Sequence, residues 1–162
     1  MILFLFRVIH FFQLYHQGFT VISRRTFIYD AKANSWTDGP SLLTPRMYHC
    51  SCVIQLDDGS TRSIIIIGGY TKEREDSNTT EILDINVQKW VQGPSLPSGL
   101  RYTTCVTLPQ TSCLLCVVLG TGTNLEFSGT GAYGLDKRLM EWKFLGKISS
   151  YSGRSACTAL PL

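Results

Sequence analysis

Short apolar, β-branched runs separated by turn-forming residues recur along most of the chain. In the clearest run, residues 63–70 (SIIIIGGY), four isoleucines are followed by two glycines. Four β-branched residues in a row favour a strand covered on both faces, and the glycines allow a sharp turn after it. Residues 113–122 (CLLCVVLGTG) repeat the pattern. The glycines of the two runs are Gly68, Gly69, Gly120 and Gly122. Because helical periodicity is missing from this region, the pattern predicts an all-β structure.

A second pattern recurs three times: an apolar residue, an aspartate, any five residues and a tryptophan. It occupies residues 29–36, 83–90 and 135–142 (YDAKANSW, LDINVQKW and LDKRLMEW), with Tyr29 counted as apolar. Its aspartates and tryptophans are Asp30, Asp84, Asp136, Trp36, Trp90 and Trp142. The tryptophans are 54 and 52 residues apart (90 − 36 and 142 − 90) and are the only three in the chain. This regular placement predicts a repeated module of about 50 residues.

An arginine follows each tryptophan after 10, 11 or 12 residues, at Arg46, Arg101 and Arg154 (46 − 36, 101 − 90 and 154 − 142). A short β-prone run with a cysteine begins after each arginine. The strands expected in the middle module span residues 46–56, 62–69, 79–86 and 89–93. Residues 57–60 (DDGS) have the chemistry of a hairpin turn. Four antiparallel strands in about 50 residues describe one blade of a β-propeller.

The order of arginine, strand, Gly-Gly-Tyr, the aspartate–tryptophan pattern and Gly-Pro resembles the Kelch repeat. Residues 46–97 carry every element, and residues 101–146 carry most of them, with the glycines separated by a threonine. The resemblance covers about residues 26–162. It implies an incomplete β-propeller built from four-stranded antiparallel Kelch blades.

The resemblance also implies how the chain is divided. Residues 26–45 are a partial blade, residues 46–97 and 101–146 are blades, and residues 154–162 begin a further blade. Residues 1–25 form an apolar N-terminal segment, interpreted as remnant strands of a first blade. Closed propellers have about 4–8 blades. We therefore expect a piece of a longer protein, a truncated product, or part of a ring completed by other copies.

The repeated residues have physical roles in such a blade. A tryptophan offers about 150–250 Å² for burial, so on an outer strand it can fill the wedge between adjacent blades. An aspartate just before a turn can accept hydrogen bonds from the turn amides. We therefore expect buried tryptophans and aspartate-capped turns at the three repeats.

Composition and charge narrow the class of protein. The chain has 44% hydrophobic and 17% charged residues, which suits a folded domain. The net charge is only +3 and no long Lys/Arg run occurs, so no nucleic-acid partner is expected. The apolar residues 1–6 are followed by Arg7 and His10, and the segment falls short of the about 20 residues that span a membrane. We expect no membrane span, and favour a packed strand or short helix over a cleaved signal peptide.

The reactive residues do not form a recognisable catalytic or metal-binding motif. The six cysteines are Cys50, Cys52, Cys105, Cys113, Cys116 and Cys157. Three of them fall near one repeated position, which favours free thiols over disulfides, although an even count leaves disulfides open. Residues 113–116 have CxxC spacing, but no second pair completes a zinc site. The three histidines lack ligand spacing, and no serine lies in a nucleophile elbow. We therefore expect no metal, no cofactor and no enzymatic activity.

The Kelch resemblance implies one rim of the ring that carries Arg46, Tyr70, Arg101 and Arg154. Arginine forms bidentate bonds with carboxylates, so these residues are the candidate partner-binding site, and a protein or acidic peptide is the candidate partner. The alternative is that each arginine pairs within the protein or caps turn carbonyls. Self-association through exposed blade faces is a further expectation.

Several functions are compatible with the resemblance. The first is a protein–protein interaction module, such as the substrate-recognition part of a cullin-type ubiquitin ligase. The alternative is an actin-binding or secreted structural Kelch protein, and the least favoured is a propeller enzyme of the sugar oxidase or sialic-acid isomerase type. A cytoplasmic location is expected, with secretion as the alternative because residues 78–80 (NTT) match the glycosylation acceptor pattern.

Overall fold

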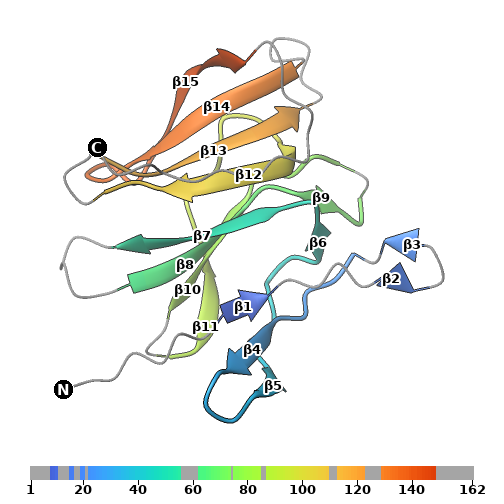
Figure 1. Ribbon diagram of the computed structural model, residues 1–162. Helices are drawn as coiled ribbons and strands as arrows, with labels where there is room; N and C mark the ends of the chain where they lie inside the picture. Colours follow the sequence, from blue (N-terminus) through green and yellow to red (C-terminus); the bar gives the residue numbers. More distant parts are fainter. Residues whose placement is uncertain are drawn as a thin grey trace.

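A computed structural model shows a stack of antiparallel β-sheets that follow one another along the chain (Figure 1). It describes residues 8–10, 15–16, 19–20, 22–55, 62–73, 75–84, 87–109, 113–122 and 129–148. Every regular element within these ranges is a strand, which confirms the all-β prediction. The same ranges contain no helix that is long and apolar enough to cross a membrane. The described sheets form an open stack rather than a closed ring.

The middle module folds as a four-stranded sheet, called here the central sheet. Its strands, in the spatial order β11-β10-β8-β7, are β7 (Cys50–Gln55), β8 (Arg62–Ile67), β10 (Thr80–Asp84) and β11 (Lys89–Gln92). The expected strand at residues 46–56 is interrupted, because Tyr48 has a positive φ of 57°. Its first part, β6 (Arg46–Met47), pairs instead with β9 (Tyr70–Thr71). The remaining three strands lie where the sequence predicted them.

The following module forms a second four-stranded sheet, called here the third sheet. Its strands, in the order β12-β13-β14-β15, are β12 (Arg101–Thr107), β13 (Leu114–Gly122), β14 (Gly129–Asp136) and β15 (Trp142–Ile148). Strand β13 continues through Gly120 and Gly122, whereas Gly68 and Gly69 have φ values of 64° and 103° and end β8. A Cβ on Gly120 would lie 2.8 Å from the Thr103 methyl group. The separated glycines therefore allow close packing rather than a turn.

The first module contributes a smaller sheet. Its three strands, in the order β1-β4-β5, are β1 (Val8–His10), β4 (Phe27–Asp30) and β5 (Ser35–Asp38). A separate hairpin joins β2 (Tyr15–His16) to β3 (Phe19–Thr20). The antiparallel pairing of β1 with β4 agrees with the strand interpretation of the N-terminal segment.

Two of the repeated tryptophans connect each sheet to the module before it. The indole Nε1 of Trp90 donates to the Pro40 carbonyl at 2.8 Å, and that of Trp142 donates to the Pro94 carbonyl at 3.0 Å. Trp90 and Trp142 are 4% and 7% exposed, whereas Trp36 is 46% exposed. The expected wedge of buried tryptophan is therefore present at two of the three repeats.

Leucines from the connecting segments extend these contacts into two core clusters. Leu42 packs with Ile66, Leu83 and Trp90 of the central sheet. Leu96 and Leu100, which follow the central sheet, are likewise buried and belong to a second cluster. That cluster includes Ile54, Ile65, Ile67, Leu115, Cys116, Val118, Tyr133, Leu135 and Trp142. The core thus lies between sheets, because each module buries its apolar face against the next one.

The three repeated aspartates accept hydrogen bonds from turn amides. Asp30 Oδ1 accepts from the amides of Lys32 and Ala33 at 2.9 and 3.1 Å, and Asp84 Oδ1 accepts from Val87 at 3.2 Å. The equivalent oxygen of Asp136 accepts from the amides of Arg138 and Leu139 at 2.9 and 3.0 Å. This capping was predicted from the repeat and fixes each turn before the tryptophan strand.

Candidate functional site

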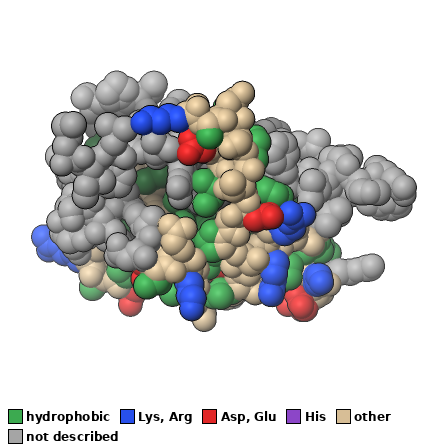
Figure 2. Space-filling view, turned by 90° about the horizontal axis from the view of Figure 1, so that it is seen from below, with side chains coloured by type: hydrophobic (Ala, Val, Ile, Leu, Met, Phe, Trp, Pro, Cys, Tyr) green, Lys and Arg blue, Asp and Glu red, His purple; other side chains and the backbone are tan. Residues whose placement is uncertain are grey.

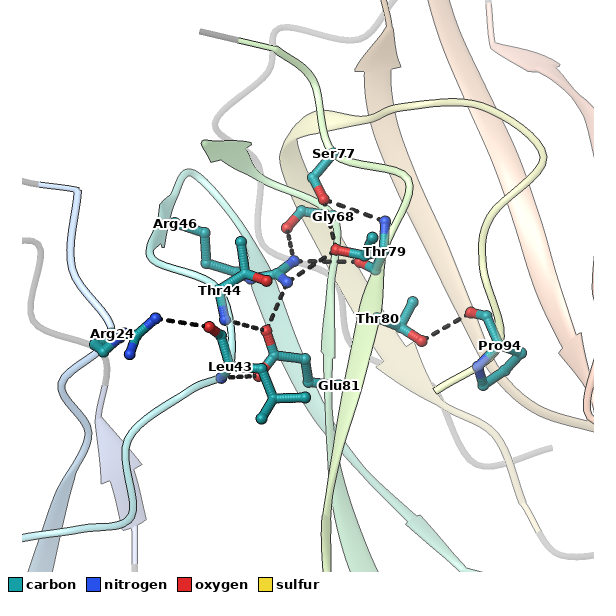
Figure 3. A network of polar contacts seen from close by, with 10 residues as sticks. All are labelled: Arg24, Leu43, Thr44, Arg46, Gly68, Ser77, Thr79, Thr80, Glu81 and Pro94. Atoms are coloured by element: carbon teal, nitrogen blue, oxygen red, sulfur yellow. Dashed lines mark hydrogen bonds and ion pairs between the residues drawn. The ribbon is translucent and has the colours of Figure 1, made fainter. Parts of the chain in front are cut away.

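Arg46 is enclosed in the protein and binds other parts of the same chain (Figure 3). Its Nη1 donates to the carbonyl oxygens of Gly68 and Thr79 at 2.6 and 3.2 Å. Its Nη2 donates to the Thr79 hydroxyl at 2.9 Å and to Glu81 Oε1 at 2.7 Å. The Arg46 and Glu81 side chains are 0% and 2% exposed. The guanidinium is therefore inaccessible to a partner in this structure. Arg46 instead pairs within the protein, which was the alternative expected from the sequence.

Glu81 also holds the connection from the preceding module. Its two carboxylate oxygens accept hydrogen bonds from the backbone amides of Leu43 and Thr44 at 2.7 and 3.0 Å. Burial lowers the pKa of Arg46, while the attraction and hydrogen bond of Glu81 oppose this effect. Each member of the pair has several hydrogen-bond partners, which offset the cost of its burial. Arg46 and Glu81 thus join two modules rather than recognise a partner.

Arg101 lies in a different environment, at the start of β12. The ring centroids of Tyr70 and Tyr102 are 5.6 and 5.7 Å from its Cζ atom, within the range of cation–π contact. Its Nε is 3.3 Å from Asp76 Oδ1, and the Arg101 and Asp76 side chains are 36% and 3% exposed. The Tyr102 ring also contacts Tyr48, with centroids 4.5 Å apart. These five residues (Tyr48, Tyr70, Asp76, Arg101 and Tyr102) are called here the arginine–tyrosine cluster.

The glycine pair after β8 brings Tyr70 to this position. Gly69 donates from its amide to the Leu100 carbonyl at 2.7 Å, so the turn lies directly beside the start of β12. A Cβ at Gly68, whose φ is 64°, would be 2.7 Å from the Leu100 carbonyl oxygen, and the φ of 103° at Gly69 excludes most side chains. Only a glycine therefore allows this close approach of the central and third sheets.

The loop between β9 and β10 supplies the acid of the cluster. Asp76 forms an isolated antiparallel bridge with Tyr70, and the Ser77 amide donates to the Gly69 carbonyl at 2.8 Å. On the other side, a Cβ at Gly99 would clash with the Asp76 carbonyl oxygen. The backbone of the loop is therefore packed directly against the segment that leads into Arg101.

This arrangement can bind a carboxylate. A guanidinium has five N–H donors, and one carboxylate can accept at most two of them in a bidentate pair. Asp76 contacts Arg101 as an ion pair at Nε without forming a hydrogen bond to it, so the guanidinium donors are left for a second acceptor. The tyrosine rings offer rigid apolar area beside the charge, a combination enriched where proteins bind partners. The geometry suits an acidic side chain or peptide more than a metal ion or a neutral ligand.

The structure brings together only part of the site expected from sequence. Tyr70 and Arg101 are in contact, Arg46 is buried away from solvent, and Arg154 lies outside the described residues. Sequence reasoning missed the other members of the cluster, Tyr48, Asp76 and Tyr102. A signal for the tyrosines was present, because an aromatic residue follows each of the first two repeat arginines within two positions.

Other chemistry receives little support from the described part of the chain. No three His, Cys, Asp or Glu residues there are grouped as a metal site would require. On the face shown in Figure 2, basic and acidic side chains are scattered among apolar ones rather than gathered in one charged patch. The arginine–tyrosine cluster is therefore the strongest candidate site that these residues present.

Comparison with known proteins gives two partial matches, and no family model matches the sequence. One F-box/kelch-repeat protein of Arabidopsis thaliana is 36% identical over 69 residues, which are 43% of this chain and 16% of the relative. Another F-box/kelch-repeat protein of the same plant is 28% identical over 82 residues, which are 51% of this chain and 19% of the relative. The matched segments therefore span less than a fifth of the length of these curated relatives. The chain is similar to kelch-repeat proteins over about half of its own length.

Proposed function

We propose that the chain is a protein-interaction module with Kelch-type propeller architecture. In this proposal residues 26–45 are part of a blade, and residues 46–97 and 101–146 are successive blades. Two four-stranded antiparallel sheets with equivalent tryptophan contacts support it. The partial similarity to two kelch-repeat proteins adds support. Ring closure needs blades beyond the described sheets, supplied by the rest of a longer protein or by other copies.

The partner in this proposal presents an acidic side chain to the arginine–tyrosine cluster. The observation that carries the proposal is the half-exposed Arg101, which is held by Asp76 and flanked by the rings of Tyr70 and Tyr102. Charge-assisted hydrogen bonds to arginine are stronger than neutral ones. Because Asp76 already fixes the guanidinium, binding loses less side-chain entropy than it would at a freely moving arginine.

A role in substrate recognition for a cullin-type ubiquitin ligase is the finer part of the proposal. Its support is the resemblance to Kelch adaptors and the similarity to two F-box/kelch-repeat proteins. A cytoplasmic location belongs to this finer part of the proposal. The absence of catalytic activity belongs to the same proposal.

The test is binding of acidic peptides to the 162-residue chain. Fluorescently labelled peptides rich in Asp and Glu are compared with peptides of the same sequence in which Asn and Gln replace the acids. We expect fluorescence anisotropy to show binding of the acidic set only. Arg101→Gln should weaken it by about tenfold or more, as loss of a charged hydrogen bond predicts.

Two variants separate recognition from folding. Arg101→Lys keeps the charge beside Asp76 but removes bidentate bonding, so it should give an intermediate affinity. Arg25→Gln removes a similarly charged side chain from an exposed ion pair with Asp38, and should bind like the unchanged chain. Equal affinities for the acidic and neutral peptides, or equal losses in the Arg101→Gln and Arg25→Gln variants, would refute the proposed site.

A further inference from the structure

A group of cysteines lies between the central and third sheets, apart from the arginine–tyrosine cluster. Cys50 and Cys52 are two positions apart on β7 and therefore share one face of the strand with Ile54. Ile54 is fully buried, and both cysteines pack against the core cluster that the two sheets share. Strand β7 thus directs two thiols toward the third sheet.

A third thiol points toward β7 from the opposite side. On β12, Thr103, Cys105 and Thr107 alternate along the strand and share one face. The Thr103 hydroxyl donates to the Ile67 carbonyl at 3.1 Å, and the Thr107 hydroxyl donates to the Val53 carbonyl at 2.5 Å. Both acceptors belong to the central sheet, so Cys105, which lies between the two threonines, faces that sheet as well.

The backbone contacts also place Cys105 at the height of the β7 cysteines. The Thr103 amide donates to the Tyr48 carbonyl at 3.2 Å. Cys105 lies two residues after Thr103, and Cys50 lies two residues after Tyr48. Two residues after Cys105, the Thr107 contact reaches Val53. Cys105 therefore lies level with residues 50–52.

A fourth thiol completes the group. Cys116 on β13 pairs in register with Thr107 on β12, and paired residues of neighbouring strands lie on the same face of a sheet. Cys116 is fully buried in the same core cluster. The four residues Cys50, Cys52, Cys105 and Cys116 are called here the thiol cluster, and all of them carry free thiols in this structure.

The thiols of the cluster are not equivalent. Hydrogen bonds from Cys105 and then from Cys116 lower the pKa of Cys52 to about 4, although burial acts in the opposite direction. The neighbouring sulfur atoms of Cys50 and Cys52, together with burial, raise the pKa of Cys105. The cluster therefore favours a thiolate at Cys52 beside a protonated Cys105, and the thiolate is the nucleophilic form of cysteine.

Metal binding and oxidation are the two reactions that clustered thiols support. The described residues contain no group of His, Cys, Asp or Glu arranged to hold a metal ion. Oxidation to a disulfide needs only two sulfurs from separate strands that are close to one another, and the side chains of Cys52 and Cys105 are joined by a hydrogen bond. Both residues are partly exposed, so a small oxidant can reach them.

We propose that the thiol cluster is an oxidation site at which hydrogen peroxide couples Cys52 to Cys105 as a disulfide between β7 and β12. In the first step the Cys52 thiolate attacks one peroxide oxygen, the O–O bond breaks, and Cys52 sulfenic acid and hydroxide form. In the second step that hydroxide takes the Cys105 proton and becomes the first water, and the resulting Cys105 thiolate attacks the Cys52 sulfur. The S–O bond breaks, and the departing hydroxide takes up the proton that Cys52 released on ionisation, which gives the second water. Overall, two thiols and one peroxide give one disulfide and two waters.

The test maps the products of peroxide treatment in the folded 162-residue chain. The reduced protein is treated with hydrogen peroxide, remaining thiols are alkylated, and peptides are analysed by mass spectrometry without reduction. We expect a Cys52–Cys105 linked peptide that disappears after dithiothreitol. In Cys105→Ser, dimedone should trap Cys52 as a sulfenic acid, with about tenfold more label than on the exposed Cys113, because the thiolate is the reactive form.

Matched variants make the result decisive. Cys113→Ser should leave the linked peptide unchanged, whereas Cys52→Ser and Cys105→Ala should both abolish it. Circular dichroism identifies variants that have lost the fold. The dimedone readout at Cys52 is taken in Cys105→Ser, whose hydroxyl can still donate to Cys52, and labelling should be weaker in Cys105→Ala because that donor is lost. The proposal is overturned if the linked peptide joins two chains, if it contains another cysteine in place of Cys52 or Cys105, or if Cys113 is oxidised first.

Discussion

At the scale of single residues, burying the charges of Arg46 and Glu81 carries a large desolvation cost. Both charges are buried, and together they bind the carbonyls of Gly68 and Thr79 and the amides of Leu43 and Thr44. Removing one member of a buried pair leaves the other charge without compensation, which costs about 3–5 kcal/mol. The pair therefore ties the folding of the first module to that of the second.

We predict that Arg46→Met lowers the free energy of unfolding by about 3–5 kcal/mol. The measurement is urea denaturation followed by circular dichroism. Arg25→Met is the matched control, since its pair with Asp38 is 57% and 70% exposed and exposed pairs contribute about 0–1 kcal/mol. A loss below about 1 kcal/mol in Arg46→Met would show that the buried pair is not what holds these segments together.

His49 makes the stability depend on pH. Both of its ring nitrogens are buried although the residue as a whole is half-buried. Burial, and then repulsion by Arg46, lower the pKa of His49 from 6.5 to about 3. Between these two values the unfolded chain binds a proton that the folded chain does not. Protonation therefore favours unfolding, and the contribution of His49 to stability falls as the pH drops below about 6.5.

We predict that this contribution decreases by about 1.4 kcal/mol per pH unit between pH 6 and pH 4. Urea denaturation at several pH values measures it. His49→Gln should be less stable or equal at neutral pH, but its stability should fall less steeply with acid because glutamine does not titrate. Parallel pH profiles for the two proteins would mean that another group causes the acid sensitivity.

At the scale of elements, the tryptophan strands connect neighbouring sheets. Trp142 on β15 is buried and donates to the carbonyl of Pro94, as Trp90 does to that of Pro40. We predict that Trp142→Phe lowers the free energy of unfolding by about 1–3 kcal/mol, because it removes this hydrogen bond and leaves a small cavity. Trp36→Phe, at the exposed position, should cost about 0.5 kcal/mol or less. Chemical denaturation of both variants measures these changes. Equal losses in the free energy of unfolding would contradict a role of Trp142 in connecting neighbouring sheets.

The elements themselves were largely predictable. The spacing of the tryptophans located the modules, and the aspartates identified the turns, because both depend on interactions within a few residues or on a repeated contact. The break at Tyr48 was not predictable, since its positive φ belongs to the pairing of β6 with β9 rather than to local propensity. The continuation of β13 through Gly120 was missed for a similar reason, because it depends on pairing with β14, where Gly120 lies opposite Gly131.

At the scale of the whole molecule, sequence reasoning predicted contacts between sheets only partially. Arg46 and Arg101 occupy equivalent repeat positions, yet one is buried against Glu81 and the other is half-exposed beside Asp76. The difference comes from acids 35 residues after Arg46 and 25 residues before Arg101 (81 − 46 and 101 − 76), which the repeat pattern does not include. The thiol cluster likewise depends on which residues of β7 and β12 lie beside one another, and the sequence of one strand alone does not determine this.

The stack of sheets has exposed apolar side chains at both ends. Trp36 on β5 and Leu145 on β15 are each about half exposed. Trp142 contacts the preceding module, so Leu145, three positions further along β15, faces outward. Inside the stack, equivalent faces are covered by the next module. Association can bury the apolar side chains that are uncovered at these end faces, and two different ends in contact would give open, head-to-tail assemblies.

We predict that the 162-residue chain associates increasingly with concentration, through the β15 face of one copy and the β5 face of another. Sedimentation velocity should show an average mass that rises above 18.1 kDa. Leu145→Lys should shift the curve toward monomer, because a buried lysine without a partner is costly. Val87→Lys is the matched control, since Val87 is also exposed but lies in the turn between β10 and β11. A monomer at every concentration, or equal effects of the two lysines, would show that these end faces do not mediate association.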